Sequence, residues 1–463
     1  MDTDRPVDLQ EPLEELARRP SRFQHDLSFP PAEKIRVYDD TLRDGEQMPG
    51  VAISPGNKYD LARALSEIGV HIMDVGFPAV SESERETLRL ILEGRRLGEL
   101  REDLEVVCMM RSTPSDIDAT MRVMDELGHP RDAVTYFVFT SASDLHVKYK
   151  LGRTLLAREG IPASEWLELP VEFYRDANLR MMCDAIRYAR EQGATSIEFG
   201  GEDGSRADVE YIKRMHREGL AAGGTRPSTP DTVGCYSPYA VKDYIGQLKA
   251  ATPEAPLVVH FHNDLGLGAW NTVTALGSGA EVFTTSVNGI GERTGNAPMH
   301  QVLLQLRYLF DIDIPGFRYD KLRELARHME RVSGIPVQPT EPGIGLNVFS
   351  HESGIHTAGM LIHPAIYQFI SPEDMGDEVR YVYGKHSGAV VIEHALREGG
   401  VRPEPALVAR VIEEVKRLRE ERAQREDFSE FQRLYYDHLE GMGVSAQEVV
   451  EIAVALSGES AGY

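Results

Sequence analysis

The sequence has few cysteines and no long apolar segment, and both absences restrict the class of protein. Its 463 residues include 3 cysteines, which lie far apart and form no Cys-x-x-Cys pair. A disulfide framework and a cysteine-ligated zinc site are therefore not indicated. No apolar run reaches the roughly 18 residues that a membrane-spanning helix needs. The acidic, polar N-terminus lacks the apolar core of a secretion signal. We therefore expect a cytoplasmic protein without a membrane partner.

Basic residues are also scarce relative to acidic ones. Lys and Arg together number 50, against 74 Asp and Glu, which gives a formal net charge of −24. A chain with this charge repels nucleic acid and anionic membrane surfaces in bulk. We therefore expect no nucleic-acid partner, and we expect small anions to bind only where cationic side chains gather locally.

What the sequence does contain is a regular alternation of short apolar runs and longer amphipathic segments, which begins at Lys34. Strand-like runs occupy residues 34–40, 71–77, 104–110, 134–140, 196–199, 257–261 and 282–287. Helical spacing between and after them occupies residues 56–69, 82–97, 114–127, 172–192, 207–222, 238–250, 268–278 and 296–310. This alternation predicts a parallel sheet, and polar signatures just after strands are typical of a (β/α)8 TIM barrel. The eighth strand is expected in the polar stretch 224–233, because the barrel requires one more strand.

Two segments interrupt the alternation. Residues 154–170 read as an extended loop and a candidate lid, and prolines surround a single predicted helix at 319–333. The tail is helical over 404–424, 427–441 and 446–456, and without a persistent a/d register its charges predict a solvated face. The predicted organisation is an N-terminal extension (1–32, with one short helix at 9–18), a catalytic TIM barrel (33–312), a linker region (313–345) and a mainly helical C-terminal subdomain (346–463).

Two histidines separated by one residue stand at the end of an apolar run. Successive strand side chains alternate between faces, so His260 and His262 share one face. Asp44 follows another predicted strand at the turn around Gly45. Two imidazoles and a carboxylate form an open ligand set typical of a catalytic metal. Taken singly, each stretch is equally compatible with hydrogen-bonded core histidines or an ordinary charged turn.

Three segments together resemble the signatures of one enzyme family. They are Thr-Leu-Arg-Asp-Gly-Glu-Gln at 41–47, His-Phe-His-Asn-Asp at 260–264 and Asn-Gly-Ile-Gly-Glu-Arg-Thr-Gly-Asn at 288–296. Over roughly residues 34–400 the chain resembles the metal-dependent TIM-barrel acyltransferases and lyases, which include 2-isopropylmalate, homocitrate and citramalate synthases. The resemblance implies a Claisen-type condensation of acetyl-CoA with a 2-oxo acid, followed by thioester hydrolysis. It also implies a divalent metal (Mn, Mg, Zn or Co) that the 2-oxo acid chelates.

The resemblance also assigns roles to individual residues. Asp44, His260 and His262 match the metal ligands, and Asn296 matches a further ligand or near-ligand. Arg43 matches the arginine that faces the ketone oxygen, where a fixed guanidinium would stabilise developing negative charge. The remaining matches form the predicted substrate site, with Glu202 near the reacting atoms and the 2-oxo acid bound by Arg43, Gln47, His146 and Thr232. Alternatively, these polar residues only hold strand-end loops in place.

Two further residues that resemble the synthases lie beyond the predicted barrel. His356 and Tyr367 match a histidine and a tyrosine that reach from the C-terminal region of one subunit into the barrel mouth of its partner. The resemblance therefore implies a homodimer with swapped C-terminal segments. The implied role is removal of a methyl proton from acetyl-CoA, which is weakly acidic and needs a positioned base. The alternative is a structural histidine.

Three other functions compete with a synthase. A hydroxymethylglutaryl-CoA-type lyase uses a cysteine in the glycine loop after the last strand, and residues 288–296 contain none. A biotin carboxyltransferase or aldolase on the same barrel is less favoured, because a carboxyltransferase of this type needs a lysine that becomes carbamylated near the metal, and no such context is present. A non-catalytic scaffold protein predicts a broken ligand set, whereas this one is intact.

The sequence favours one 2-oxo acid without excluding others. Gly76-Phe77-Pro78 and the spacing of Asp144, His146 and Lys150 resemble isopropylmalate synthases, so 3-methyl-2-oxobutanoate is the preferred substrate. Homocitrate synthases tend to place an arginine in this pocket for a distal carboxylate. Little sequence follows residue 400, so the amino-acid-sensing domain usual in isopropylmalate synthases is not expected. Homocitrate, citramalate, Re-citrate and phosphonomethylmalate synthases therefore stay open as alternatives.

Overall fold

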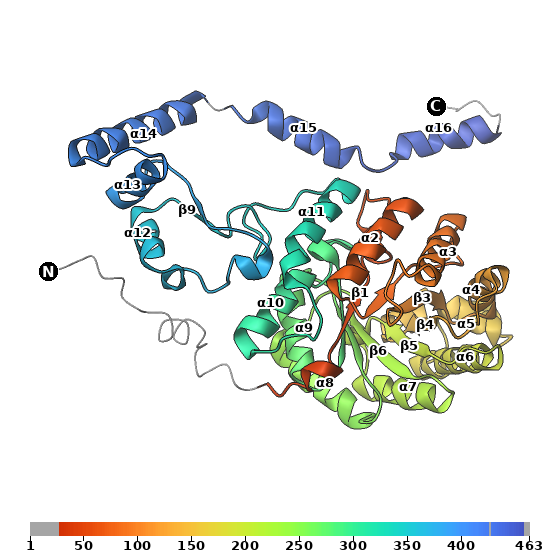
Figure 1. Ribbon diagram of the computed structural model, residues 1–463. Helices are drawn as coiled ribbons and strands as arrows, with labels where there is room; N and C mark the ends of the chain where they lie inside the picture. The colour runs from red at the N-terminus through yellow and green to blue at the C-terminus, as the bar shows by residue number, and fades with distance from the viewer. Residues whose placement is uncertain (1–26, 426, 458–463) are drawn as a thin grey trace. The chain divides into compact units, whose positions relative to one another are not determined.

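The computed structural model describes residues 27–425 and 427–457, which divide into two compact units (Figure 1). Residues 27–48 and 52–336 form one unit, and residues 49–51 and 337–457 belong to the other. The short helix predicted at 9–18 lies outside the described residues. Among the described residues, no helix combines the length and the apolarity that a membrane crossing requires.

The first unit is built on a closed barrel of eight parallel strands, which confirms the predicted fold class. Each strand pairs with the next in the chain, and β8 closes the barrel by pairing with β1. The strands are β1 (Arg36–Asp39), β2 (Ile72–Asp74), β3 (Glu105–Arg111), β4 (Thr135–Ser141), β5 (Ile197–Glu202), β6 (Arg226–Asp231), β7 (Val258–Phe261) and β8 (Val282–Thr285).

Helices surround this barrel, as Figure 1 shows. Several begin at an N-cap side chain that accepts a hydrogen bond from a backbone N–H of the first turn: Ser54, Ser81, Asp208 and Ser237. The helices of this unit are α2 (Pro55–Ile68), α3 (Glu82–Arg96), α4 (Pro114–Leu127), α5 (Gly152–Arg158), α6 (Val171–Glu191), α7 (Val209–Ala221), α8 (Pro238–Ala251), α9 (Gly268–Leu276), α10 (Met299–Phe310) and α11 (Leu322–Ser333).

The predicted sixth strand forms despite its polar, proline-containing sequence. β6 pairs with β5 through Gly200 and Ser228, and with β7 through Ser228 and Val258. Its arginine, Arg226, is buried but is balanced by ion pairs to Glu198 and Glu105. Pairing on both edges therefore overrides the weak strand propensity of this stretch.

The extended loop predicted at 154–170 is wrong. The segment contains the end of α5 and a 3-10 turn at Ala163–Glu165. Leu155 and Leu156 are fully buried and pack in one cluster with Tyr174 of α6. Trp166 holds the segment in place, because its Nε1 donates a hydrogen bond to the Lys148 carbonyl at 2.6 Å. Two adjacent leucines in a short helix give no helical period, so the sequence pattern concealed this packed element.

The second unit is mainly helical, as predicted for the C-terminal region. Its helices are α12 (Gly354–Ile362), α13 (Ala389–Glu398), α14 (Pro405–Arg425), α15 (Ser429–Glu440) and α16 (Ala446–Ser457). A two-stranded parallel sheet joins β9 (Ser350–His351) to β10 (Arg380–Tyr381). A small core packs α13 against α14 through Val391, Ile392 and Val408. The helix predicted at 319–333 forms as α11 (Leu322–Ser333). It packs against α2 of the barrel, so its contacts group it with the first unit and not with the C-terminal one.

Candidate active site

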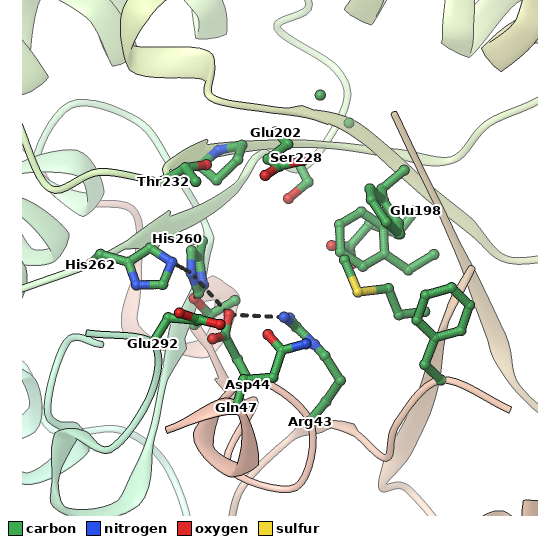
Figure 2. A pocket seen from close by; sticks show the side chains of 18 of the residues that line it. Arg43, Asp44, Gln47, Glu198, Glu202, Ser228, Thr232, His260, His262 and Glu292 are labelled. Carbon is green, nitrogen blue, oxygen red and sulfur yellow. Dashed lines mark hydrogen bonds and ion pairs between the residues drawn. The ribbon is translucent and has the colours of Figure 1, made fainter. Parts of the chain in front are cut away.

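Three predicted metal ligands meet at the carboxyl ends of two barrel strands. Asp44 follows β1 in the turn that leads to the 3-10 helix Gly45–Gln47, His260 lies in β7 and His262 directly follows β7. One potential ligand atom from each lies within 4.8 Å of the others. The two imidazole Nε2 atoms are 3.1 Å apart, and Asp44 Oδ2 is 3.4 Å from His260 Nε2. All three side chains are buried and converge in Figure 2.

Neighbouring polar groups orient the His260 ring. Its Nδ1 atom lies 2.7 Å from the Thr284 hydroxyl and 3.0 Å from Asp40 Oδ2. A carboxylate behind a ligating histidine commonly fixes ring orientation and leaves the other nitrogen for a metal. Asn296 adjoins this shell, because its amide donates to Asp40 Oδ1 at 3.4 Å. Asp40 was not predicted as a site residue. The only feature of the sequence that could have indicated a role for it is its position directly after β1.

The polar atoms of the cluster fit a bound cation. Asp44 Oδ1, His262 Nδ1 and Asn296 Oδ1 are buried, and no described residue supplies a hydrogen-bond partner for them. Such unpartnered atoms are rare in folded proteins unless a ligand or an ion satisfies them. One carboxylate with two imidazoles suits divalent ions such as Mn, Zn and Co. The cluster is therefore a candidate metal site.

The electrostatics of the cluster also favour a positive charge. Burial opposes ionisation of Asp44, but the Arg43 guanidinium and both imidazoles outweigh it and lower its pKa to about 2. Burial and the neighbouring His260 lower the pKa of His262 to about 3. Both groups are therefore deprotonated near neutral pH, as metal ligands must be. Burial lowers the pKa of His260, but its hydrogen bond to Asp40 outweighs this and raises it.

Arg43 is fixed beside the candidate metal site by two carboxylates. Its Nε donates to Asp74 Oδ2 at 2.7 Å, and a terminal nitrogen donates to Asp44 Oδ2 at 2.8 Å. Burial disfavours the guanidinium charge, but Asp74 and Asp44 outweigh it and raise the pKa of Arg43. Asp74, at the end of β2, was not predicted. Burial raises the pKa of Asp74 to about 6 in spite of its arginine partner.

A cavity of about 460 Å³ opens above this cluster at the barrel mouth. One side of the cavity is polar and carries predicted site residues: Arg43, Asp44, Gln47, Glu202, Thr232, His260 and His262. Another part is apolar and carries an aromatic and methionine wall: Tyr38, Phe77, Met109, Phe137 and Phe139. The barrel mouth thus joins a ligand-binding end to a compartment for an apolar group.

Comparisons with known proteins place this chain in a family. A family model described as HMGL-like matches residues 34–159 and 157–327. A second model, described as homocitrate synthase post-HMGL domain-like, matches residues 344–423. The chain belongs to the HMGL-like family. This confirms the resemblance that the three sequence signatures indicated.

Relatives of this HMGL-like chain carry the names of three synthases. A protein named homocitrate synthase from Methanopyrus kandleri is 35% identical over 412 residues, which cover 89% of this chain and 94% of that one. A probable 2-isopropylmalate synthase from Ignicoccus hospitalis is 38% identical and covers 86% and 90%. A putative (R)-citramalate synthase from Methanoculleus marisnigri is 35% identical and covers 83% and 69%.

The other predicted substrate residues of the HMGL-like barrel lie at or behind the cavity wall. The Thr232 hydroxyl accepts a hydrogen bond from the Asp203 backbone N–H at 2.8 Å, which fixes it at the mouth. Lys150 forms an ion pair with Glu202. His146 is absent from the described residues that line the cavity. It stands behind them, 3.8 Å from Glu202 and 3.6 Å from Asp203.

The two predicted C-terminal site residues lie together in the second unit. The rings of His356 and Tyr367 stack with centroids 4.1 Å apart and an interplanar angle of 23°. Both residues are exposed. Their stacking keeps an imidazole and a phenol side by side on the surface of this unit.

Sequence reasoning did not select three charged residues that line the cavity. Glu292 and Arg293 belong to the quoted segment 288–296, and Arg293 spans the mouth by pairing with Asp264 and donating to the Thr232 carbonyl. Their charges in a glycine-rich loop were an available signal. Glu198 lies within β5, where nothing in the sequence distinguishes a cavity residue from a core one.

Proposed function

We propose that this chain is a synthase of the 2-isopropylmalate type, which condenses acetyl-CoA with 3-methyl-2-oxobutanoate. The named homocitrate, 2-isopropylmalate and citramalate synthases among its relatives support the reaction class, a condensation of acetyl-CoA with a 2-oxo acid. The observation that carries the choice of substrate is the pairing of the cations that line the cavity.

Each described cation at the cavity wall already has a carboxylate partner. Arg43 is held by Asp44 and Asp74, Lys150 pairs with Glu202, and Arg293 pairs with Asp264. A second carboxylate or a phosphonate on the substrate would need a cation of its own, since burying an unpaired charge is costly. The aromatic and methionine wall instead suits a branched aliphatic group. An uncharged side chain therefore fits this compartment best.

We assign the metal site to Asp44, His260 and His262, with Asn296 adjoining it. The donor set is compatible with Mn, Mg, Zn or Co. Bound there, the cation would act as a Lewis acid toward the ketone of the 2-oxo acid. Arg43 is directed to the same place, where its guanidinium stabilises the negative charge that forms on the ketone oxygen.

The remaining assigned residues orient the 2-oxo acid. Thr232 and Gln47 line the cavity and offer a hydroxyl and an amide to its carboxylate. Glu202 lies at the mouth near the position where the new bond forms, and His146 stands behind it with its Nδ1 3.8 Å from the carboxylate. This arrangement holds the ketone carbon ready for attack from the mouth of the barrel.

The acetyl-CoA half of the reaction needs a base. We propose that the chain forms a homodimer in which His356 and Tyr367 act at the barrel mouth of the partner subunit. The stacked, exposed imidazole and phenol are suited to remove a methyl proton, directly or through water. The methyl carbon then bonds to the ketone carbon, the ketone oxygen becomes a hydroxyl, and water cleaves the thioester to a carboxylate and free CoA. The cytoplasmic location stays a prediction.

The test is release of the CoA thiol from acetyl-CoA in the presence of different 2-oxo acids. The panel contains 3-methyl-2-oxobutanoate, pyruvate, 2-oxoglutarate, oxaloacetate and phosphonopyruvate. We expect the highest kcat/KM for 3-methyl-2-oxobutanoate, and the 2-alkylmalate product is identified by mass spectrometry. Reactions without a 2-oxo acid, and reactions with His262→Ala, control for thioesterase contamination. A higher kcat/KM with any of the three doubly acidic substrates contradicts the assignment.

A further inference from the structure

One buried carboxyl group faces the cavity on the side opposite the candidate metal site. Figure 2 shows Glu198 across the cavity from Asp44, His260 and His262. The side chain is only 1% exposed. Its Oε2 accepts hydrogen bonds from Arg226 at 2.8 and 3.1 Å, whereas no described residue supplies a partner for Oε1. A buried carboxyl oxygen is thus left unsatisfied beside the compartment for the substrate side chain.

The backbone of β5 keeps this carboxyl reachable from the mouth. Strand alternation directs Glu198, Gly200 and Glu202 to one face, with Glu198 deepest in the barrel. Gly200 between them has no side chain, so nothing from β5 covers Glu198 on its cavity side. A Cβ at Gly200 would lie 2.4 Å from the Ser228 carbonyl oxygen, so the close approach of β6 requires glycine here.

The positive charge beside Glu198 does not exceed the negative charge around it. Arg226 is shared, because it also donates to both carboxylate oxygens of Glu105 at 2.9 and 3.2 Å. Asp74 adds a further negative charge, and the Tyr38 ring lies beneath the Arg226 guanidinium at 6.0 Å. One arginine therefore balances two carboxyl groups, and a substrate carboxylate arriving at this end would meet no free cation.

We propose that Glu198 determines substrate specificity by excluding 2-oxo acids whose side chain ends in a second anionic group, an inference that rests on the proposed function of this cavity. A like charge placed against a buried carboxyl group is strongly disfavoured where the local dielectric is low. An aliphatic side chain packs against the aromatic and methionine wall and brings no like charge to Glu198. The cavity therefore selects its substrate partly by rejecting acidic competitors.

The test compares two 2-oxo acids of the same shape and different charge. 2-Oxoglutarate and 5-methyl-2-oxohexanoate differ in a terminal carboxylate against a terminal isopropyl group. Each is titrated as a competitor of 3-methyl-2-oxobutanoate. The inhibition constant of 2-oxoglutarate divided by that of 5-methyl-2-oxohexanoate then measures discrimination by charge alone. Glu198→Gln removes the carboxyl whose Oε1 has no partner among the described residues, while Arg226 keeps an amide oxygen as acceptor, so we expect this ratio to fall by about tenfold or more.

The matched control is Glu105→Gln. It removes the other carboxylate from Arg226, but Glu105 is absent from the described residues that line the cavity. Glu105→Gln gives Arg226 wholly to Glu198 but leaves the carboxyl that faces the cavity in place, so we expect it to lower the ratio much less than Glu198→Gln does. An unchanged ratio in Glu198→Gln would overturn the inference, and so would an equal fall in both variants, which would assign the effect to the charge on Arg226. Thermal unfolding verifies that both variants fold.

A second measurement uses the unmodified protein. Burial raises the pKa of Glu198 to about 7, against the opposing effect of Arg226, whereas a substrate carboxylate stays ionised above pH 5. Charge discrimination should therefore be greatest at pH 8 and should weaken toward pH 6, where Glu198 becomes neutral. Both competitors use the same metal site, so its titration cancels in the ratio. A ratio that does not change with pH would contradict the inference, whereas a wild-type preference for 2-oxoglutarate as substrate would overturn the proposed function itself.

Discussion

Two buried carboxyl groups face the same cavity, and each lies beside an arginine. Asp44 is 4% exposed and pairs with Arg43, and Glu198 is 1% exposed and pairs with Arg226. Their pKa values are nevertheless shifted in opposite directions from the ordinary values. The pKa of Asp44 is lowered to about 2, whereas that of Glu198 is raised to about 7.

The difference follows from how many positive groups each carboxyl can use. Burial raises both pKa values, but at Asp44 the guanidinium and two imidazoles together outweigh burial. At Glu198, burial prevails because Arg226 is shared with Glu105. An arginine beside a buried acid therefore does not by itself fix its charge. One end of the cavity carries the candidate metal site, and the other holds an acid that is costly to ionise.

The largest expected effect comes from breaking the cation-binding end. His262→Ala should lose bound metal and lower kcat by at least about a thousandfold, because a Lewis acid supplies several kcal/mol. Barrel-mouth residues contribute little to the core, so Tm should change little. Metal content, kcat and thermal unfolding are measured together. The control is His328→Ala on α11, a histidine that is not among the described residues that line the cavity, and it should leave metal content and kcat unchanged.

Chelation gives the same result without a substitution. Removing the metal from the wild type should abolish turnover, and adding back Mn, Mg, Co or Zn should restore it. Full activity in a sample verified as metal-free would refute the metal site.

The next effect concerns the arginine on the same side. Arg43→Lys keeps a positive charge but loses the planar fork that contacts Asp44 and Asp74. We expect kcat to fall about a hundredfold, roughly 3 kcal/mol, with a much smaller change in binding of the 2-oxo acid. Steady-state kinetics and direct titration of the 2-oxo acid separate the two quantities.

The control for Arg43 is Arg175→Lys, which makes the same change at a two-point contact with Asp144 outside the cavity. It should leave kcat unchanged. An unchanged kcat in Arg43→Lys would return Arg43 to a structural role.

A smaller effect, on stability, tests the opposite end. The folded-state pKa of Glu198, about 7, lies above its ordinary value of 4.5, so the folded protein retains a proton that the unfolded chain releases. The stability contributed by this group is present at low pH and is lost as pH rises toward 7. The free energy of unfolding of Glu198→Gln, relative to wild type, should therefore increase by about 2 kcal/mol between pH 5 and pH 8.

Glu105→Gln is the control for this stability measurement, because its expected sign is opposite. Burial raises the pKa of Glu105, but Arg226 outweighs it and the pKa is lowered. Removing that carboxylate should therefore destabilise the protein above pH 5. Denaturant unfolding at both pH values measures the two variants. If the free energy of unfolding of both variants, relative to wild type, changed in the same direction between pH 5 and pH 8, the raised pKa of Glu198 would be refuted.

The smallest departure from wild-type activity is expected in the test of the proposed exchange of His356 between subunits. Co-expression of the inactive variants Arg43→Ala and His356→Ala should restore activity, because a mixed dimer receives one intact site. Random pairing makes half of the dimers mixed, so about a quarter of wild-type kcat is expected. Tagged copies verify the mixed dimers. If these remain inactive, His356 acts in its own chain or has no catalytic role.

The barrel and the candidate metal site were predictable because their signals are local or follow a general rule. Strand alternation placed His260 and His262 on one face, and the structure brings them together with Asp44. The eighth strand was inferred from barrel closure and forms as β6, although its residues have little strand propensity. The error at α5 arose because its two buried leucines are adjacent and reveal no helical period.

The sequence by itself determined the reaction class and the candidate metal site at one end of the cavity, since motif spacing and side-chain alternation are properties of short segments. Only the tertiary structure decided that Asp74 holds Arg43 and that Glu198 faces the cavity. Arg226 lies 28 residues from Glu198 and 121 from Glu105, so their shared ion pairing exists only once three strands lie in one barrel. The charge of a buried acid depends on such distant partners and on the exclusion of water, and neither is written in the local sequence.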